Sequence, residues 1–400
     1  MKKYQQLILV ILSVFSFVSL LIYRHEYNKL RYVLEVFNFF GTPGVPSHQN
    51  AGHNVSVDKY IMSEPLPAWQ RVSDTLYLYS AYWEVVGNKG HVKAPAIGVL
   101  NENLNYGCYL WYEFHPNPVK AQFSFSELPR KNSESAKKSK SIKTKGFMFY
   151  CEAGNDETSQ AFLPIYKIKT DRAVQNSTAI CVLPNEFYYL KKRNYLEFLT
   201  FHRVIGIKDF IIYGANFQYN IISPILKDPS LDTNLMVLQW NYPFYGDSHM
   251  MLYIAENDCI LRASGLYENV IILKWNQFFV PNTHSSAQTI ISNLDPEKKM
   301  SVLQIYTSVF CLEYNDDPSL NSTQPLIFRK TRYALLKNDD PVLIYNTNVK
   351  TGATKRISSS IVNVHWYAKC NNLELKLKKK ADQSMLMFES EIMQSKIMRL

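Results

Sequence analysis

The region from residue 179 to residue 281 alternates apolar, strand-like runs with stretches of helical spacing. The apolar runs are residues 179–184, 209–214, 235–240 and 269–273. Between the first two runs, an apolar stripe from Tyr195 to Ile205 has helical spacing, and Gly206 is a typical helix stop. Residues 248–263 have a helical pattern as well. This alternation predicts βαβ units and an α/β fold with a mostly parallel sheet flanked by helices.

Parallel sheets of this kind bind ligands beyond the carboxyl ends of their strands. The fourth apolar run is followed at once by Lys274-Trp-Asn-Gln-Phe-Phe-Val-Pro. We therefore expect chemistry at residues 274–281. Upstream, residues 66–175 contain short aromatic, β-prone segments without a long helical run, which predicts an N-terminal β-rich subdomain.

Several segments, taken in order, are similar to glycosyltransferase family 92. They are Cys181-Val-Leu-Pro, Tyr195-Leu-Glu-Phe-Leu-Thr-Phe-His-Arg-Val-Ile-Gly, Phe210-Ile-Ile-Tyr, Asn257-Asp-Cys-Ile, Phe278-Phe-Val-Pro, the early Leu78-Tyr-Ser-Ala-Tyr-Trp and the late Val364-His365. The resemblance extends from residue 75 to residue 370. It implies a GT-A-like domain and an inverting glycosyltransferase. Such an enzyme transfers a hexose from UDP-galactose or a related donor to a glycan acceptor on protein or lipid.

One departure from that family lies at the expected site. The family has an Asp-x-Asp-Glu sequence before Phe-x-Val-Pro, whereas this chain has Lys274, Asn276 and Gln277 in place of the three carboxylates. Two carboxylates at i and i+2 can hold Mn²⁺, which neutralises the donor diphosphate. The resemblance implies Mn²⁺ as cofactor, with His365 completing its shell. A charged lysine cannot ligate a cation and asparagine is a weak donor, so the metal ligands are missing here.

Two hypotheses follow for this site. In the first, Lys274 supplies the positive charge itself, aided by the basic cluster at Arg329, Lys330 and Arg332. In the second, the site has decayed and the protein binds a glycan or a protein partner without catalysis. The donor-site candidates are Lys274, Asn276, Gln277, Asp258, His365 and Arg329. Asp258 lies on a predicted helix, where it either forms a salt bridge or cap, or faces the donor. The pattern assigns no catalytic base.

Other function classes find little support in the sequence. No Gly-x-Ser-x-Gly elbow, Gly-x-Gly-x-x-Gly fingerprint or P-loop occurs. The chain has 44 basic and 34 acidic residues, a net charge of +10. Residues 131–145 and 376–380 contain much of the excess lysine, and we interpret both as solvated loop or tail. A nucleic-acid partner is therefore not expected.

A run of 17 uncharged residues, Leu7 to Tyr23, is long enough to span a bilayer as a helix. A cleavable signal peptide is the alternative, but no clear Ala-x-Ala site follows. Asn54, Asn176 and Asn321 begin Asn-x-Ser/Thr sequons. No two of the six cysteines have Cys-x-x-Cys spacing. They can form up to three disulfides, and fifteen complete pairings are possible. The alternative is that several of them are buried free thiols. We expect a single-pass type II protein of the Golgi or another secretory membrane, with a lumenal body.

The predicted organisation has six parts. They are a cytosolic N-terminus at 1–6, a transmembrane signal-anchor at 7–23, a stem at 24–65, the β-rich subdomain at 66–175, the GT-A-like domain at 176–370 and a basic, methionine-rich tail at 371–400. In the tail, Met385, Phe388 and Ile392 have helical spacing. An amphipathic helix and a frayed tail are both open there.

Overall fold

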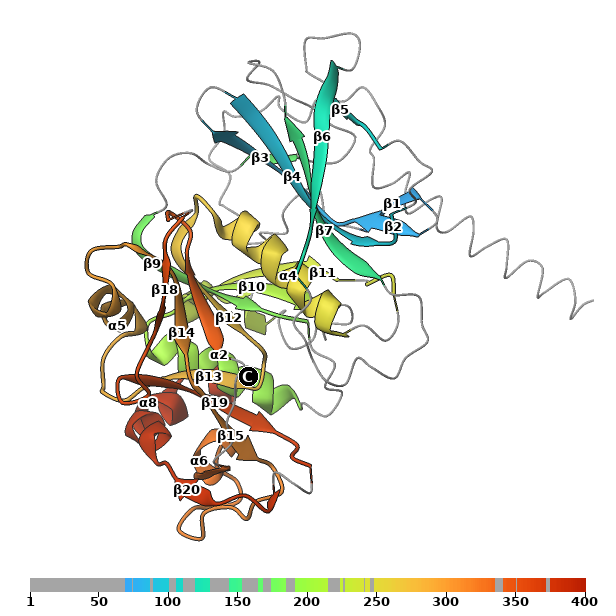
Figure 1. Ribbon diagram of the computed structural model, residues 1–400. Helices are drawn as coiled ribbons and strands as arrows, with labels where there is room; N and C mark the ends of the chain where they lie inside the picture. Colours follow the sequence, from blue (N-terminus) through green and yellow to red (C-terminus); the bar gives the residue numbers. More distant parts are fainter. Residues whose placement is uncertain are drawn as a thin grey trace, which may run out of the picture. The chain divides into compact units, whose positions relative to one another are not determined.

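The structure is a computed structural model of the chain. It describes residues 69–73, 75–86, 89–100, 106–110, 119–129, 144–152, 165–167, 174–184, 191–214, 224–225, 227–240, 242–244, 248–334, 341–349, 351–371 and 375–400. All of these belong to one compact unit, Asp58–Leu400. The strands of this unit form three sheets (Figure 1).

The first sheet has eight strands and comes from the N-terminal part of the described chain. Its strands are β1 (Gln70–Ser73), β2 (Leu76–Leu78), β3 (Ala81–Val86), β4 (Lys89–Gly98), β5 (Cys108–Leu110), β6 (Val119–Glu127), β7 (Lys145–Glu152) and β8 (Ile165–Lys167). The order is β1-β2-β4-β7-β6-β5, and β3 pairs with β4 and β8. Neighbours are antiparallel except β3 and β8. The β-rich character predicted for this region is therefore confirmed, whereas its standing as a separate domain stays a prediction.

The second sheet has seven strands in the order β11-β10-β9-β12-β17-β14-β18. Its strands are β9 (Val174–Val182), β10 (Asp209–Gly214), β11 (Asn234–Gln239), β12 (Tyr267–Leu273), β14 (Met300–Ile305), β17 (Val342–Asn346) and β18 (Ala353–Arg356). The neighbours β11, β10, β9 and β12 are parallel. β17 is antiparallel to both β12 and β14, and β18 is parallel to β14.

The third sheet has five strands in the order β13-β19-β15-β16-β20. They are β13 (Gln277–Pro281), β15 (Thr307–Cys311), β16 (Arg332–Ala334), β19 (Val362–Ala368) and β20 (Lys379–Ala381). In this sheet β15 and β19 are parallel, and the remaining pairs are antiparallel. The prediction of a mostly parallel sheet is thus wrong for the molecule, although four parallel strands form the centre of the second sheet. Antiparallel strands need only short connections, and the chain after Pro281 offers few long helical stretches.

The helices lie beside these sheets (Figure 1). They are α2 (Lys192–Val204), α4 (Ser248–Ala263), α5 (Ala287–Leu294), α6 (Leu326–Arg329) and α8 (Glu389–Gln394). On α2, Phe198 and Phe201 are buried in the main core. The chain leaves this helix through Gly206, whose φ of 93° is in the region that favours glycine. The predicted helix and its predicted stop are both confirmed.

The C-terminal tail packs onto the core through short helices. Residues Ser384–Phe388 form a 3₁₀ turn that leads into α8. Met385, Phe388 and Ile392 are all buried in the same cluster as the α2 aromatics. The amphipathic alternative for the tail is therefore confirmed, as a 3₁₀ turn followed by a short α-helix.

Each cysteine is paired, and each pair joins cysteines that are consecutive in the sequence. The disulfides are Cys108–Cys151, Cys181–Cys259 and Cys311–Cys370. The second joins β9 to α4 and so ties together two elements that border the carboxyl ends of the parallel strands. The disulfide alternative of the sequence analysis is confirmed, with one of the fifteen pairings.

Some of the residues in the membrane and sequon predictions are described by the structure, and others are not. Residues 1–68, which contain the apolar run and Asn54, lie outside it. Among the described helices, none combines the length and apolarity needed to cross a bilayer. Asn176 and Asn321 are both exposed, at the start of β9 and in a turn respectively. Glycosylation at these positions stays a prediction.

Candidate functional site

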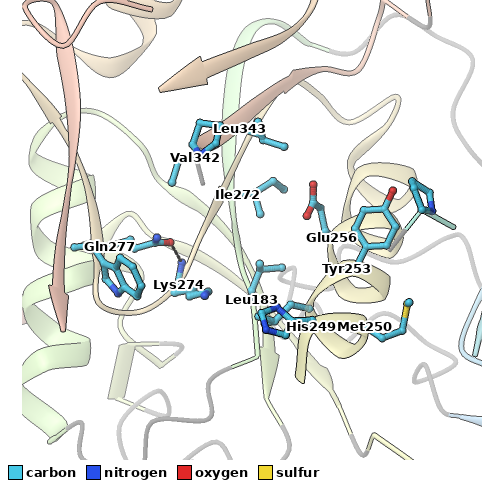
Figure 2. Close-up of a pocket in the computed structure, with 14 residues that line it drawn as sticks. Leu183, His249, Met250, Tyr253, Glu256, Ile272, Lys274, Gln277, Val342 and Leu343 are labelled. Atoms are coloured by element: carbon cyan, nitrogen blue, oxygen red, sulfur yellow. Dashed lines mark hydrogen bonds between the residues drawn. The ribbon is translucent and has the colours of Figure 1, made fainter. Parts of the chain in front are cut away.

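A cavity of about 160 Å³ lies at the carboxyl ends of β9 and β12, the edge where the sequence predicts chemistry. We call it the strand-end cavity. Its walls come from β9, α4, the turn after β12, β17 and β19 (Figure 2). The polar and aromatic side chains in these walls are His249, Tyr253, Glu256, Lys274, Gln277 and Trp366.

Lys274 is the first residue after β12 and lines this cavity from the turn that leads into β13. The Lys274 backbone N–H donates to Gln277 Oε1 at 2.9 Å, and the Gln277 N–H donates to the Lys274 carbonyl at 2.9 Å. The Lys274 ammonium lies 5.6 Å from the centroid of the Trp366 ring, within the range of a cation–π contact. The turn and the ring together hold a positive charge at the strand ends.

The first turns of α4 form the facing wall. His249, Tyr253 and Glu256 follow one another at spacings of four and three residues, so they lie on one side of the helix. Glu256 is buried, and its Oε1 accepts a hydrogen bond from the Tyr345 hydroxyl at 2.7 Å. Burial and the Glu256 charge raise the pKa of Tyr253. The N-terminal end of the helix adds partial positive charge to this wall.

Asn276 does not line the strand-end cavity. It belongs to a second cavity, of about 400 Å³, and its Nδ2 donates to the Tyr367 carbonyl at 2.9 Å. The i and i+2 side chains diverge because residues 275–276 form a turn, not a continuation of the strand. Beyond the turn, the paired strands β13 and β19 separate the cavities. Trp366 lines the first cavity and Tyr367 lines the second.

Asp258 is fully buried between α4, β3 and β10. It accepts hydrogen bonds from the Tyr82 hydroxyl at 2.5 Å and the Tyr213 hydroxyl at 2.6 Å, and it pairs with Arg262 at 3.1 Å. It lines neither cavity. Of the two roles open from the sequence, the salt bridge is therefore confirmed.

His365 lies on β19, buried against the Phe310 ring with 4.4 Å between centroids. Its Nε2 is 3.2 Å from Asp382 Oδ2. Burial raises the pKa of Asp382, but the proximity of His365 and the hydrogen bonds from Ser384 outweigh it, so the pKa of Asp382 is lowered. His365 lines neither cavity, and the structure does not bring it together with Lys274.

Arg329 ends α6 and lines the second cavity. Its guanidinium pairs with Asp316, and its Nε donates to the Gln324 carbonyl at 3.1 Å. Neighbouring Lys330 also pairs with Asp316, at 2.8 Å. Of the six candidates, Lys274 and Gln277 thus share one cavity, Asn276 and Arg329 share another, and Asp258 and His365 belong to neither.

The residues of the strand-end cavity do not fit Mn²⁺. Among the described residues that line this cavity, Glu256 is the one carboxylate. A single carboxylate beside an ammonium is a poor set of ligands for a hard cation. Within the described ranges, no three His, Cys, Asp or Glu side chains are grouped so that they could hold a metal ion.

Sequence reasoning chose the wrong residues on α4 and β19: it named Asp258 and His365, whereas Glu256 and Trp366 line the cavity. Glu256 lies two residues before Asp258, on a different side of the helix. The signal was present as the spacing of His249, Tyr253 and Glu256, but periodicity alone does not tell which face of a helix borders a cavity. Trp366, beside the predicted His365, carried no signal of its own.

Comparisons with known proteins leave the family open. No protein-family model matches the chain, and no curated protein matches it. The family 92 resemblance accordingly stays a prediction.

Among solved structures, similar chains include S. aureus TarS 1–349, with 15% identity over 55% of this chain and 66% of that chain. HddC from Yersinia pseudotuberculosis has 8% identity over 55% of this chain and 100% of its own. The 4-diphosphocytidyl-2C-methyl-D-erythritol synthase of Anaerococcus prevotii has 12% identity over 54% and 95%. This chain therefore spans just under two thirds of the TarS fragment. All three TM-scores are 0.26, too low to assign a fold or a function to this chain.

Proposed function

We propose that this protein is a glycosyltransferase that binds a nucleoside-diphosphate hexose at the strand-end cavity without a divalent cation. The observation that carries the proposal is the position of Lys274, which directly follows the parallel strand β12 and lines the cavity with its ammonium near the Trp366 ring. UDP-galactose is the donor that the family resemblance implies. The acceptor is a hydroxyl of a glycan on protein or lipid.

The charge of Lys274 suits the leaving group of this reaction. When the bond from the anomeric carbon to the diphosphate oxygen breaks, negative charge grows on the nucleoside diphosphate. A fixed ammonium stabilises that charge more strongly in the transition state than in the ground state, which is what accelerates the step. At an effective dielectric constant of 20, two unit charges 4 Å apart attract by about 4 kcal/mol.

Glu256 is the side chain best placed to serve as general base. It is a buried carboxylate in the wall formed by α4 (Figure 2). In an inverting transfer, the acceptor oxygen forms a bond to the anomeric carbon while its proton passes to Glu256 and the diphosphate leaves. The Tyr345 hydroxyl, hydrogen-bonded to Oε1, orients the carboxylate.

The volume of the strand-end cavity limits how much of the donor it encloses. At about 160 Å³ it is smaller than the roughly 300–1,000 Å³ of drug-sized ligand sites. It therefore encloses only the part of the donor beside Lys274, and the rest of the donor extends beyond it.

A second candidate is a protein that binds a glycan or a partner protein without catalysis. The observation that favours it is the replacement of all three expected carboxylates, at Lys274, Asn276 and Gln277. For either candidate we propose a single-pass type II protein of the Golgi or another secretory membrane. The apolar run Leu7 to Tyr23 and the three disulfides support that location.

The test is calorimetric titration of UDP-galactose into the full-length protein purified in detergent, with Mn²⁺ or with a chelator. We expect binding that is unchanged by Mn²⁺ and at least tenfold weaker in Lys274→Ala. Lys299→Ala is the matched control, because Lys299 is an exposed lysine paired with Glu297; it should bind like the wild type.

Activity separates the two candidates. With UDP-galactose and a glycan acceptor array, Glu256→Gln should keep donor binding but lose transfer. Binding that requires Mn²⁺ would contradict the metal-free site. Binding without transfer in the wild type would favour the non-catalytic candidate, and absence of binding to any UDP-sugar would refute a donor site at Lys274.

A further inference from the structure

The second cavity lies across the β13–β19 pair from the strand-end cavity. With a volume of about 400 Å³ it is the larger of the two and falls within the range of small-molecule sites. It is formed by α2, the turn before β13, β19 and the segment around α6. The glycosyl transfer proposed above makes no use of it.

Glu197 of α2 supplies one polar group of this cavity. Its side chain is 2% exposed, and both carboxylate oxygens lie 3.1 Å from the Leu326 N–H, with Arg193 3.3 Å away. Burial raises the pKa of Glu197 to about 7, against the opposing hydrogen bond from Leu326 and the charge of Arg193. Near neutral pH this carboxyl group can therefore either accept or donate a hydrogen bond.

Asn276 supplies a second polar group. Asn276 is 3% exposed, and its Nδ2 donates a hydrogen bond to the Tyr367 carbonyl. Its Oδ1 has no hydrogen-bond partner among the described residues. A buried acceptor without a donor is destabilising, and such groups in folded proteins call for an explanation. A ligand that brings a hydroxyl donor would provide one.

The cations around this cavity are already engaged. Arg193 pairs with Glu197, Arg329 with Asp316, and Lys330 with Asp316 and the Leu312 carbonyl. Lys191 is exposed to solvent, where its charge is screened. An anionic ligand would have to compete with these internal partners, so the charge pattern does not favour one.

The rest of the lining is mixed: aromatic Trp275, Phe278 and Tyr367, aliphatic Leu312, Leu326 and Ile327, and polar Asn194 and Gln324. The three aromatic residues add apolar surface to the cavity wall. A sugar ring has apolar C–H faces and polar hydroxyl groups. The aromatic surface can pack against the C–H faces, and the amide carbonyl and the carboxyl group can accept hydrogen bonds from the hydroxyl groups.

We propose that the second cavity is a carbohydrate site, which binds one uncharged hexose unit of a glycan through hydroxyl donors to Asn276 and Glu197. The site is independent of the donor: Lys274 and Gln277 line one side of the β13–β19 pair, and Asn276 lies on the other. It would hold a glycan chain to the protein whether or not transfer occurs.

The test measures binding of methyl β-D-galactopyranoside, methyl β-D-glucopyranoside and methyl α-D-mannopyranoside to the full-length protein by saturation-transfer difference NMR. We expect saturable binding of at least one of them. Asn276→Leu, which removes the acceptor while keeping a similar volume, should weaken it at least tenfold. Asn293→Leu is the matched control because Asn293 is exposed on α5, and it should bind normally.

Two further variants keep the test decisive. Glu197→Gln should weaken hexoside binding severalfold, which gives a second reading if Asn276→Leu unfolds in a thermal melt. Lys274→Ala should leave hexoside binding unchanged even where it abolishes UDP-galactose binding, so this site and the donor site can fail separately. The inference is overturned if none of the three hexosides saturates or if binding survives in both cavity variants. It is also overturned if free UDP, and not the hexosides, shows binding that depends on Asn276.

Discussion

Glu197 and His202 are both buried on α2, and burial moves their pKa values in opposite directions. Desolvation raises the pKa of Glu197 to about 7 and lowers the pKa of His202 to about 3. The Nδ1 contact with the Phe198 carbonyl, at 2.8 Å, partly opposes this lowering of the pKa. The Nε2 atom accepts a hydrogen bond from the Phe279 N–H at 3.3 Å, which favours the neutral ring. A second ring proton would face that N–H, so the charged form is disfavoured.

We predict that the stability difference between Glu197→Gln and the wild type depends on pH. Because the folded-state pKa is raised from 4.5 to about 7, the folded protein binds this proton more tightly than the unfolded chain does. The contribution of Glu197 is therefore present at low pH and is lost as pH rises from about 4.5 through 7. The wild type should lose about 3 kcal/mol relative to Glu197→Gln between pH 5 and pH 8.

The measurement is urea unfolding of both proteins across this range. His202 destabilises the fold as pH falls below 6.5, in the opposite sense, but it is present in both proteins and cancels in the difference. For the control Glu297→Gln, at an exposed position, the difference in unfolding free energy from the wild type should not change with pH. If the difference in unfolding free energy between Glu197→Gln and the wild type also did not change with pH, Glu197 would not be a buried carboxyl group with a raised pKa.

At the scale of elements, the C-terminal segment works as part of the core although it lies far from α2 in the sequence. Phe388 packs edge-on against Phe201 of α2 at 5.5 Å between ring centroids and stacks on His284 at 5.3 Å. Its neighbour Met387 is 36% exposed. The alternation of buried and exposed residues follows from the helical turns of this segment.

We predict that Phe388→Ala lowers the free energy of unfolding by about 3–5 kcal/mol, because it removes a buried ring and leaves a cavity. Met387→Ala, one residue away, should change it by no more than about 0.5 kcal/mol. Denaturant unfolding of the two variants compares them directly. Equal effects would mean that the tail does not pack on α2.

At the scale of the whole molecule, the disulfides stay local. Each joins a cysteine to the next one in the sequence: one within the eight-stranded sheet, one between β9 and α4, and one beside β15 and β19. None of the three links the first sheet to the other two. The first sheet instead meets α4 through buried polar contacts such as that of Tyr82 with Asp258.

We predict that non-reducing proteolysis and mass spectrometry of the purified protein will recover three linked peptide pairs, 108–151, 181–259 and 311–370. A reduced and alkylated sample of the same preparation serves as the control. Recovery of any peptide that joins different pairs would contradict the arrangement of strands around these cysteines.

The sequence by itself determined the local elements of this protein. Apolar runs and helical stripes predicted β9 to β12, α2 and α4, and Gly206 marked the end of α2, because these signals depend on residues close together in the chain. It also predicted that residue 274 follows the last of the central parallel strands. Local pattern decides such features because backbone conformation and side-chain periodicity are set over a few residues.

Tertiary structure decided what the local pattern leaves open. It placed Asn276 in a different cavity from Lys274, brought Glu256 into the strand-end cavity, and buried Asp258 in a network with Tyr82. It also added antiparallel strands to the parallel core and chose one disulfide pairing of fifteen. These outcomes depend on contacts between residues far apart in the sequence, such as Asn276 with Tyr367 or Cys181 with Cys259. Their energies come from packing and burial that no single segment contains.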